Sequence, residues 1–184
     1  MEKILFVNAC VRENSRTLAL AKTILEKWNN EYTEVNLRET DLRPLNRESL
    51  EKRERLVLEG NFSDNMFSLA KEFAAADKIV IAAPYWDLTF PALLKIYLEQ
   101  ITVCGITFEY RKGIPHGLCK SKTLIYVTTA GGMIYKNFGF EYIKTLAETF
   151  FNIPEVLCFK AEGLDIRGAS VEKIMTEAKG GIKL

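Results

Sequence analysis

The strongest constraint on this chain is a set of five short apolar stretches distributed along its 184 residues. They cover residues 4–7, 33–37, 79–82, 123–127 and 156–159. Several are continuous runs of aliphatic side chains rather than alternations of apolar and polar ones. Continuous runs are typical of strands that are covered on both faces, as in parallel sheets. The pattern therefore predicts a buried, parallel β-sheet.

Segments with helical spacing lie between these stretches. Leu18, Ala21 and Leu25 are three or four residues apart, and similar spacing recurs at residues 94–101, 143–150 and 171–178. Strands that alternate with helices predict an α/β fold with helices on both faces of the sheet. For a five-stranded parallel sheet we expect the flavodoxin-like order 2-1-3-4-5, in a single domain that spans residues 1–184. The charge-balanced segment 37–60 is expected to be a loop followed by a solvated helix.

The composition argues against several classes of protein. Lys and Arg number 25 against 24 Asp and Glu, so we expect neither a nucleic acid nor a membrane as partner. No apolar run approaches the roughly 20 residues that span a bilayer, and residues 1–3 lead into a strand without the layout of a signal peptide. The four cysteines are scattered and His116 is the single histidine. We therefore expect a cytoplasmic protein with no metal site and no disulfide framework.

The segment after the first predicted strand, residues 8–17, is a candidate phosphate site. In open parallel sheets, ligands bind beyond the carboxyl ends of the strands, where the strand order reverses. Backbone N–H groups at the start of a helix can converge on a phosphate, and the helix dipole favours its charge. Ser15 and Thr17 add hydroxyl donors, while Arg12 and Arg16 add positive charge. The alternative is that Ser15 only caps the helix and the arginines are solvated.

This segment lacks the signatures of two common nucleotide-binding motifs. It has no glycine-rich run that ends in Lys-Ser or Lys-Thr, and no Gly-x-Gly-x-x-Gly turn. The absence of these motifs argues against an NTPase and against a dehydrogenase with a dinucleotide-binding domain.

Two more loops are expected at the same edge of the sheet, after the third and fourth predicted strands. The first has an aromatic pair framed by prolines, which suits a flat ring system. The second has a glycine pair, which lets the backbone approach a ligand closely. Each feature alone also fits an ordinary sheet cover or turn, but three such loops at one edge favour one binding site. The candidate residues in these two loops are Pro84, Tyr85, Trp86, Asp87, Leu88, Thr128, Thr129, Ala130, Gly131 and Gly132.

Taken in order, these segments resemble the flavodoxin-like NAD(P)H quinone reductase and FMN-dependent NADH-azoreductase family. Residues 10–17, CVRENSRT, resemble the Ser-x-Arg-x-x-Ser-x-Thr phosphate loop of related flavin reductases. Residues 84–99 resemble the family segment that begins Pro-Met-Tyr-Asn-Phe. Residues 105–110 resemble its Gly-Val-Thr-Phe-x-Tyr stretch, and residues 129–132 stand where it has Ser-Arg-Gly-Gly. The resemblance spans nearly the whole chain.

The resemblance implies an FMN-dependent oxidoreductase. Such an enzyme passes hydride from NADH or NADPH through bound flavin to a quinone, azo compound or related small acceptor. The cofactor carries the chemistry, so no catalytic side chain is implied. The phosphate is expected on Ser15, Arg16 and Thr17, with Arg12, and the ring against the other two loops. A homodimer is also implied, with aromatic side chains of the partner near the flavin; candidates are Phe90, Phe108, Tyr110, Tyr135 and Phe138.

Three positions depart from the family pattern. Cys10 replaces the usual serine, Asp87 replaces asparagine beside the ring, and Ala130 replaces arginine. A carboxylate close to the ring disfavours an anionic reduced flavin. Three alternatives stay open: a flavodoxin-type electron carrier, a free-flavin reductase, and a member that has lost FMN binding. Electron carriers of this type typically have a Thr/Ser-Gly-rich phosphate loop and a strongly acidic surface, and this chain has neither.

Overall fold

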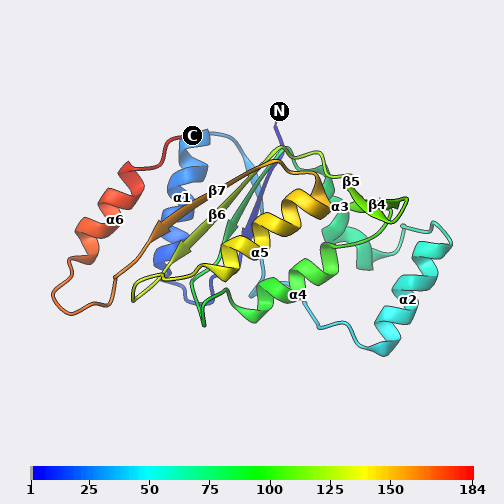
Figure 1. Ribbon diagram of the computed structural model, residues 1–184, viewed down its shortest axis with the longest axis horizontal. Helices are drawn as coiled ribbons and strands as arrows, with labels where there is room; N and C mark the ends of the chain where they lie inside the picture. Colours follow the sequence, from blue (N-terminus) through cyan, green and yellow to red (C-terminus); the bar gives the residue numbers. More distant parts are fainter. Residues whose placement is uncertain (1) are drawn as a thin grey trace.

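A five-stranded parallel sheet lies between two layers of helices in the computed structural model, which describes residues 2–184 (Figure 1). Its strands are β1 (Ile4–Asn8), β2 (Tyr32–Asn36), β3 (Lys78–Ala82), β6 (Thr123–Thr129) and β7 (Glu155–Ala161). Neighbours pair in the order β2-β1-β3-β6-β7, and every pair is parallel. The predicted fold class and the predicted order 2-1-3-4-5 are both confirmed.

The helices include all those that the sequence predicted. They are α1 (Arg16–Trp28), α2 (Arg47–Leu58), α3 (Ser68–Ala75), α4 (Ala92–Ile101), α5 (Phe138–Leu146) and α6 (Val171–Gly180). Short 3-10 and π-helical turns, Asn65–Phe67 and Ala147–Phe151, extend α3 and α5. No helix within residues 2–184 is long and apolar enough to cross a membrane.

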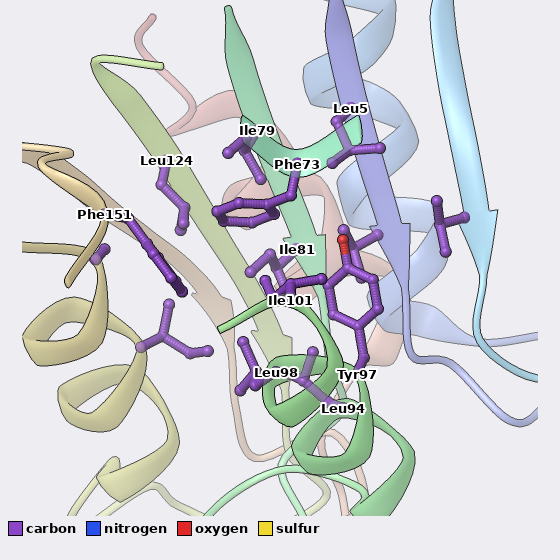
Figure 2. Packing of buried hydrophobic residues seen from close by; sticks show 14 of the residues in the cluster. Leu5, Phe73, Ile79, Ile81, Leu94, Tyr97, Leu98, Ile101, Leu124 and Phe151 are labelled. Atoms are coloured by element: carbon purple, nitrogen blue, oxygen red, sulfur yellow. The ribbon is translucent and has the colours of Figure 1, made fainter. Parts of the chain in front are cut away.

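The central strands β1, β3 and β6 are buried on both faces of the sheet, which explains why they are largely apolar. In β1, Leu5 and Val7 point into the cluster beneath α3, α4 and α5, whereas Ile4 and Phe6 point into the cluster beneath α1 and α6. Figure 2 shows the first cluster, in which α4 packs its apolar side against β3. Each side chain of this kind that is fully buried contributes about 1.5–3 kcal/mol. The labelled side chains of α4 and β3 are Leu94, Tyr97, Leu98, Ile101, Ile79 and Ile81.

The sequence pattern did not predict two elements. One is α3, which has only eight residues. The other is an antiparallel hairpin of β4 (Phe108–Arg111) and β5 (Ile114–Gly117). Its two-residue turn, Lys112 and Gly113, has φ angles of 52° and 79°, the signs expected for a type I′ turn. The usual Asn-Gly or Asp-Gly signal for this turn is missing, and the strands are too short to show a clear alternation.

Candidate functional site

A cavity of about 360 Å³ lies at the carboxyl ends of β1, β3, β6 and β7. This is the edge at which the sequence predicted the site, and β1 and β3 are the strands between which the order reverses. Its volume is within the range of about 300–1,000 Å³ that is usual for ligand pockets. Ten of the fifteen predicted residues line it: Arg12, Ser15, Arg16, Thr17, Pro84, Tyr85, Trp86, Thr129, Ala130 and Gly131.

The other five predicted residues are not part of the cavity wall. Cys10 and Thr128 are buried, Asp87 and Leu88 lie in an exposed turn, and Gly132 follows Gly131. A role for these five in binding stays a prediction. Four residues that the sequence did not single out complete the wall: Val11, Asn14, Leu164 and Asp165.

The start of α1 supplies hydrogen-bond donors to the cavity. Ser15 is the N-cap, and its Oγ accepts a 3.3 Å hydrogen bond from the Leu18 N–H. The Ala19 N–H donates to the Ser15 carbonyl oxygen at 3.0 Å. Because a helix cannot satisfy the N–H groups of its first turn, those of Arg16 and Thr17 are available to a ligand. The Ser15 hydroxyl acts as an acceptor in the cap, so its own proton can still be donated to a phosphate.

Two buried hydroxyl groups connect the loops after β1 and β6. The Oγ1 atoms of Thr17 and Thr129 are 2.6 Å apart, and either can be the donor. Each hydroxyl carries one proton, and their mutual hydrogen bond uses only one of the two. The pair therefore holds the two loops together and retains one donor for a ligand in the cavity.

The aromatic loop after β3 is fixed to its neighbours by two hydrogen bonds of Tyr85. Its N–H donates to the Thr129 carbonyl oxygen at 3.0 Å, and its hydroxyl donates to the Lys136 carbonyl oxygen at 2.9 Å. The next residue, Trp86, lies at the rim and is 41% exposed. The loop thus presents an aromatic surface that is open on one side.

The turn that follows Trp86 has a strained backbone. Trp86 and Thr89 exchange two backbone hydrogen bonds, of 3.2 and 2.8 Å. The residues between them, Asp87 and Leu88, have φ angles of 49° and 68°, the signs of a type I′ turn without glycine. Asp tolerates this region, whereas for Leu it costs about 1–3 kcal/mol. A 3.1 Å hydrogen bond from the Phe138 N–H to the Leu88 carbonyl oxygen anchors the turn. Strain of this kind is concentrated at functional sites.

The loop after β7 forms the remaining wall. Its backbone N–H groups donate to carbonyl oxygens of the loop after β6: Gly163 to Gly132 at 2.8 Å, Leu164 to Ala130 at 3.2 Å, and Asp165 to Gly131 at 2.8 Å. Asp165 Oδ1 also accepts a 2.7 Å hydrogen bond from Arg16 Nη1. A Cβ atom on Gly131 would contact the Asp165 carboxylate, so a larger residue there would push this exposed side chain aside.

Cys10 lies behind the phosphate loop as a neutral thiol. Its Sγ is 3.8 Å from the Ala82 carbonyl oxygen, to which it donates. Burial raises the pKa of the Cys10 thiol from 9.0 to about 11, because the thiolate is poorly solvated there. The replacement of serine by Cys10 therefore adds no charge near the cavity at neutral pH.

The sheet order and the position of the cavity define a flavodoxin-like α/β protein. A family model described as "Flavodoxin-like fold" matches residues 2–183. A protein of Coprothermobacter proteolyticus named FMN-dependent NADH:quinone oxidoreductase is 34% identical over 191 residues, with 97% of this chain and 94% of that protein covered. One of the same name from Lachnoclostridium phytofermentans is 33% identical, with 97% and 95% covered.

Solved structures agree in fold. An azoreductase from Bacillus anthracis superposes with a TM-score of 0.84 at 23% identity, with 98% of this chain and 96% of that chain covered. An FMN-dependent NADH-azoreductase from Bacillus anthracis, solved in complex with FMN, gives a TM-score of 0.76 at 19% identity, with 98% and 97% covered. The chain belongs to the flavodoxin-like fold family and, within it, groups with the FMN-dependent NADH:quinone oxidoreductases.

Proposed function

We propose that this protein is an FMN-dependent oxidoreductase that transfers electrons from NADH to a quinone, an azo compound or a related small acceptor. One observation carries the proposal: a single cavity joins the donors at the start of α1 to the aromatic loop after β3. Its relatives named FMN-dependent NADH:quinone oxidoreductase, which align over nearly the whole chain, support it. FMN supplies the two-electron redox chemistry when it is bound.

The donor set at one end of the cavity fits a terminal monophosphate. The N–H groups of Arg16 and Thr17, the Ser15 hydroxyl and the Arg12 guanidinium all belong to this end. Charge-assisted hydrogen bonds from such donors are the strong ones, and they fix the orientation of the group they hold. These residues would bind the FMN phosphate.

The other end of the cavity fits a flat heteroaromatic ring. Tyr85 and Trp86 supply an aromatic surface, and residues 129–131 supply backbone at close range. The Ala130 N–H donates to the Ala161 carbonyl oxygen at 2.9 Å. Within residues 2–184, no backbone hydrogen bond engages the N–H of Gly131 or of Gly132. The Gly131 amide, which lines the cavity, is therefore suited to a ring edge, while the rim beside Trp86 leaves room for NADH and then for the acceptor.

The experiment is an absorption spectrum of the purified protein, with FMN added if it is isolated without flavin, followed by anaerobic titration with NADH. We expect FMN on extraction and chromatography, and bleaching of its spectrum by NADH. FAD as the sole flavin, or no binding of added FMN, would contradict the proposal. An electron carrier would bind FMN but would not be reduced by NADH alone. A free-flavin reductase would show turnover that saturates with added FMN.

We further propose a homodimer whose interface borders the cavity. Phe90 and Phe108 are buried in their own subunit, so they do not serve as cover for a partner's flavin. Tyr110 belongs to β4, and Figure 1 shows the β4–β5 hairpin near the amino ends of the strands, whereas the cavity lies at their carboxyl ends. In contrast, Tyr135, in the loop between β6 and α5, is 90% exposed, and Phe138, the first residue of α5, is 50% exposed. Exposed apolar groups next to a cavity are typical of interfaces.

Sedimentation equilibrium at about micromolar concentration tests this interface. Tyr135→Ser is expected to weaken the dimer and to lower NADH turnover in parallel. Tyr110→Ser, the same change at the opposite edge of the sheet, is the control and is expected to leave both unchanged. A monomer with full turnover would contradict a site shared between subunits. Dissociation of the dimer by Tyr110→Ser, but not by Tyr135→Ser, would show that the interface lies at the hairpin instead.

A further inference from the structure

A carboxylate forms a salt bridge with one of the two arginines that line the cavity. Arg12, Arg16 and Asp165 are the charged side chains that line it within residues 2–184. Asp165 Oδ1 lies 2.7 Å from Arg16 Nη1. The Asp165 backbone N–H donates to the Gly131 carbonyl oxygen at 2.8 Å, which holds the carboxylate over Gly131. A phosphate that contacts the Arg16 guanidinium must therefore share it with this carboxylate or displace the carboxylate.

We propose that Asp165 is an internal competitor for the Arg16 guanidinium, and that it sets how strongly the protein prefers a phosphorylated flavin to an unphosphorylated one. The inference rests on the proposed function, since it concerns the affinity of the same cavity for FMN. It assigns to the loop after β7 a part in ligand specificity that is separate from the donors of α1.

The exposure of the pair makes Asp165 a displaceable group rather than a fixed support for Arg16. The side chains of Arg16 and Asp165 are 41% and 67% exposed. Exposed ion pairs contribute little stability, because solvent screens the charges and two long side chains must be ordered. A phosphate carries more charge and more acceptor oxygens than a carboxylate, so it forms the stronger pair with a guanidinium.

Repulsion between like charges makes Asp165 unfavourable for phosphate binding. A phosphate on Arg16 brings negative charge close to the Asp165 carboxylate, and the two groups repel each other. Asp165 can turn toward solvent, but it then loses its partner, and this loss opposes phosphate binding. Both effects weaken the binding of FMN, whereas neither acts on riboflavin, which has the same ring and no phosphate.

The experiment compares wild type and Asp165→Asn by the quenching of flavin fluorescence, with FMN and riboflavin as ligands. Asn has nearly the shape of Asp and keeps the backbone hydrogen bond to Gly131. We expect the Kd for FMN to fall about two- to tenfold, as for the removal of an exposed ion pair and a nearby like charge, and the Kd for riboflavin to stay the same. In an Arg16→Gln background the effect of Asp165→Asn is expected to shrink.

Asp41→Asn is the matched control. Asp41 pairs with Arg43 at 3.1 Å, outside the cavity, and both side chains are 82% exposed. Asp41→Asn changes the net charge by the same amount as Asp165→Asn and is expected to leave the affinities for FMN and riboflavin unaltered. Weaker FMN binding in Asp165→Asn would overturn the inference, because Asp165 would then position Arg16. An equal shift for FMN and riboflavin would also overturn it. If no variant and no wild-type protein bound flavin, the proposed function would fail as well; normal FMN binding without the shift would refute only the competition.

Discussion

Substitution of Ser15 separates its role as a helix cap from its role in binding phosphate. Ser15→Ala removes the cap acceptor and the hydroxyl donor together. Ser15→Asp keeps an acceptor at the N-cap, where Asp is as favourable as Ser, but it removes the donor and adds a negative charge. If Ser15 only caps α1 and no phosphate binds at this helix start, the Asp variant is expected to behave as wild type. If Ser15 also donates to a phosphate, the Asp variant is stable and binds FMN poorly.

The two roles have different magnitudes. Loss of an N-cap side chain costs about 0.5–2 kcal/mol. For a domain of this size each kcal/mol lowers Tm by about 2–4 °C, so Ser15→Ala is expected to lower Tm by about 1–8 °C. Loss of a hydrogen bond to a charged group costs about 1.5–3 kcal/mol, which is roughly a ten- to hundredfold loss of affinity. Ser15→Asp is expected to keep Tm at or above the wild-type value, since an anion at a helix N-terminus is favourable, and to lose at least this much affinity.

Ser170 provides a matched control elsewhere in the chain. It is the N-cap of α6, and its Oγ accepts from the Lys173 N–H at 3.3 Å, the same distance as in the Ser15 cap. Ser170→Ala is expected to reproduce the Tm loss without any change in FMN affinity. Thermal unfolding and fluorescence titration of the wild type and these three variants give both quantities. Wild-type affinity in Ser15→Asp would refute the reasoning and return Ser15 to a purely structural role.

Three further predictions follow from single sites. Asp87→Asn keeps a residue that tolerates φ near 49° and removes a carboxylate beside the expected ring. The two-electron midpoint potential of bound FMN, measured by spectroelectrochemistry, is therefore expected to rise by about 10–30 mV. An unchanged potential would show that the carboxylate lies too far from the ring to affect it. Gly117→Ala is expected to lower Tm by about 2–12 °C, because the new Cβ would collide with the backbone at Phe151, whereas Gly180→Ala, which has open space around it, is expected not to lower Tm. Burial raises the pKa of Cys10 from 9.0 to about 11, so its contribution to stability is retained below pH 9 and falls as the pH rises toward 11; chemical denaturation is expected to show a shallower fall in Cys10→Ala.

The fold could be predicted because its signals are local and redundant. A central parallel strand such as β1 is apolar along nearly its whole length, since successive side chains enter different cores, as Leu5 and Phe6 do. The rule that ligands bind beyond the carboxyl ends of the strands then placed the three loops at one edge. For this reason ten of the fifteen predicted residues line a common cavity.

Other features depend on contacts between distant parts of the chain, which a single sequence does not record. The Arg16–Asp165 pair joins residues 149 positions apart, and neither residue type predicts its partner. The turn at Asp87 and Leu88 has positive φ angles without glycine, so the usual turn signal was missing. Its conformation is imposed by the hydrogen bonds around it rather than by local preference.

The wall contributed by the loop after β7 follows from the topology, although the predicted site residues lie only in the loops after the first, third and fourth strands. The predicted order placed the fifth strand beside the fourth, and parallel strands end at the same edge, so the loop after β7 had to lie beside residues 129–132. The successive backbone hydrogen bonds from residues 163–165 to residues 130–132 are the outcome of that adjacency. A glycine at position 131 then leaves room for two groups: a ligand in the cavity and the Asp165 carboxylate. The proposed competition between Asp165 and phosphate for Arg16 is a consequence of the same strand order.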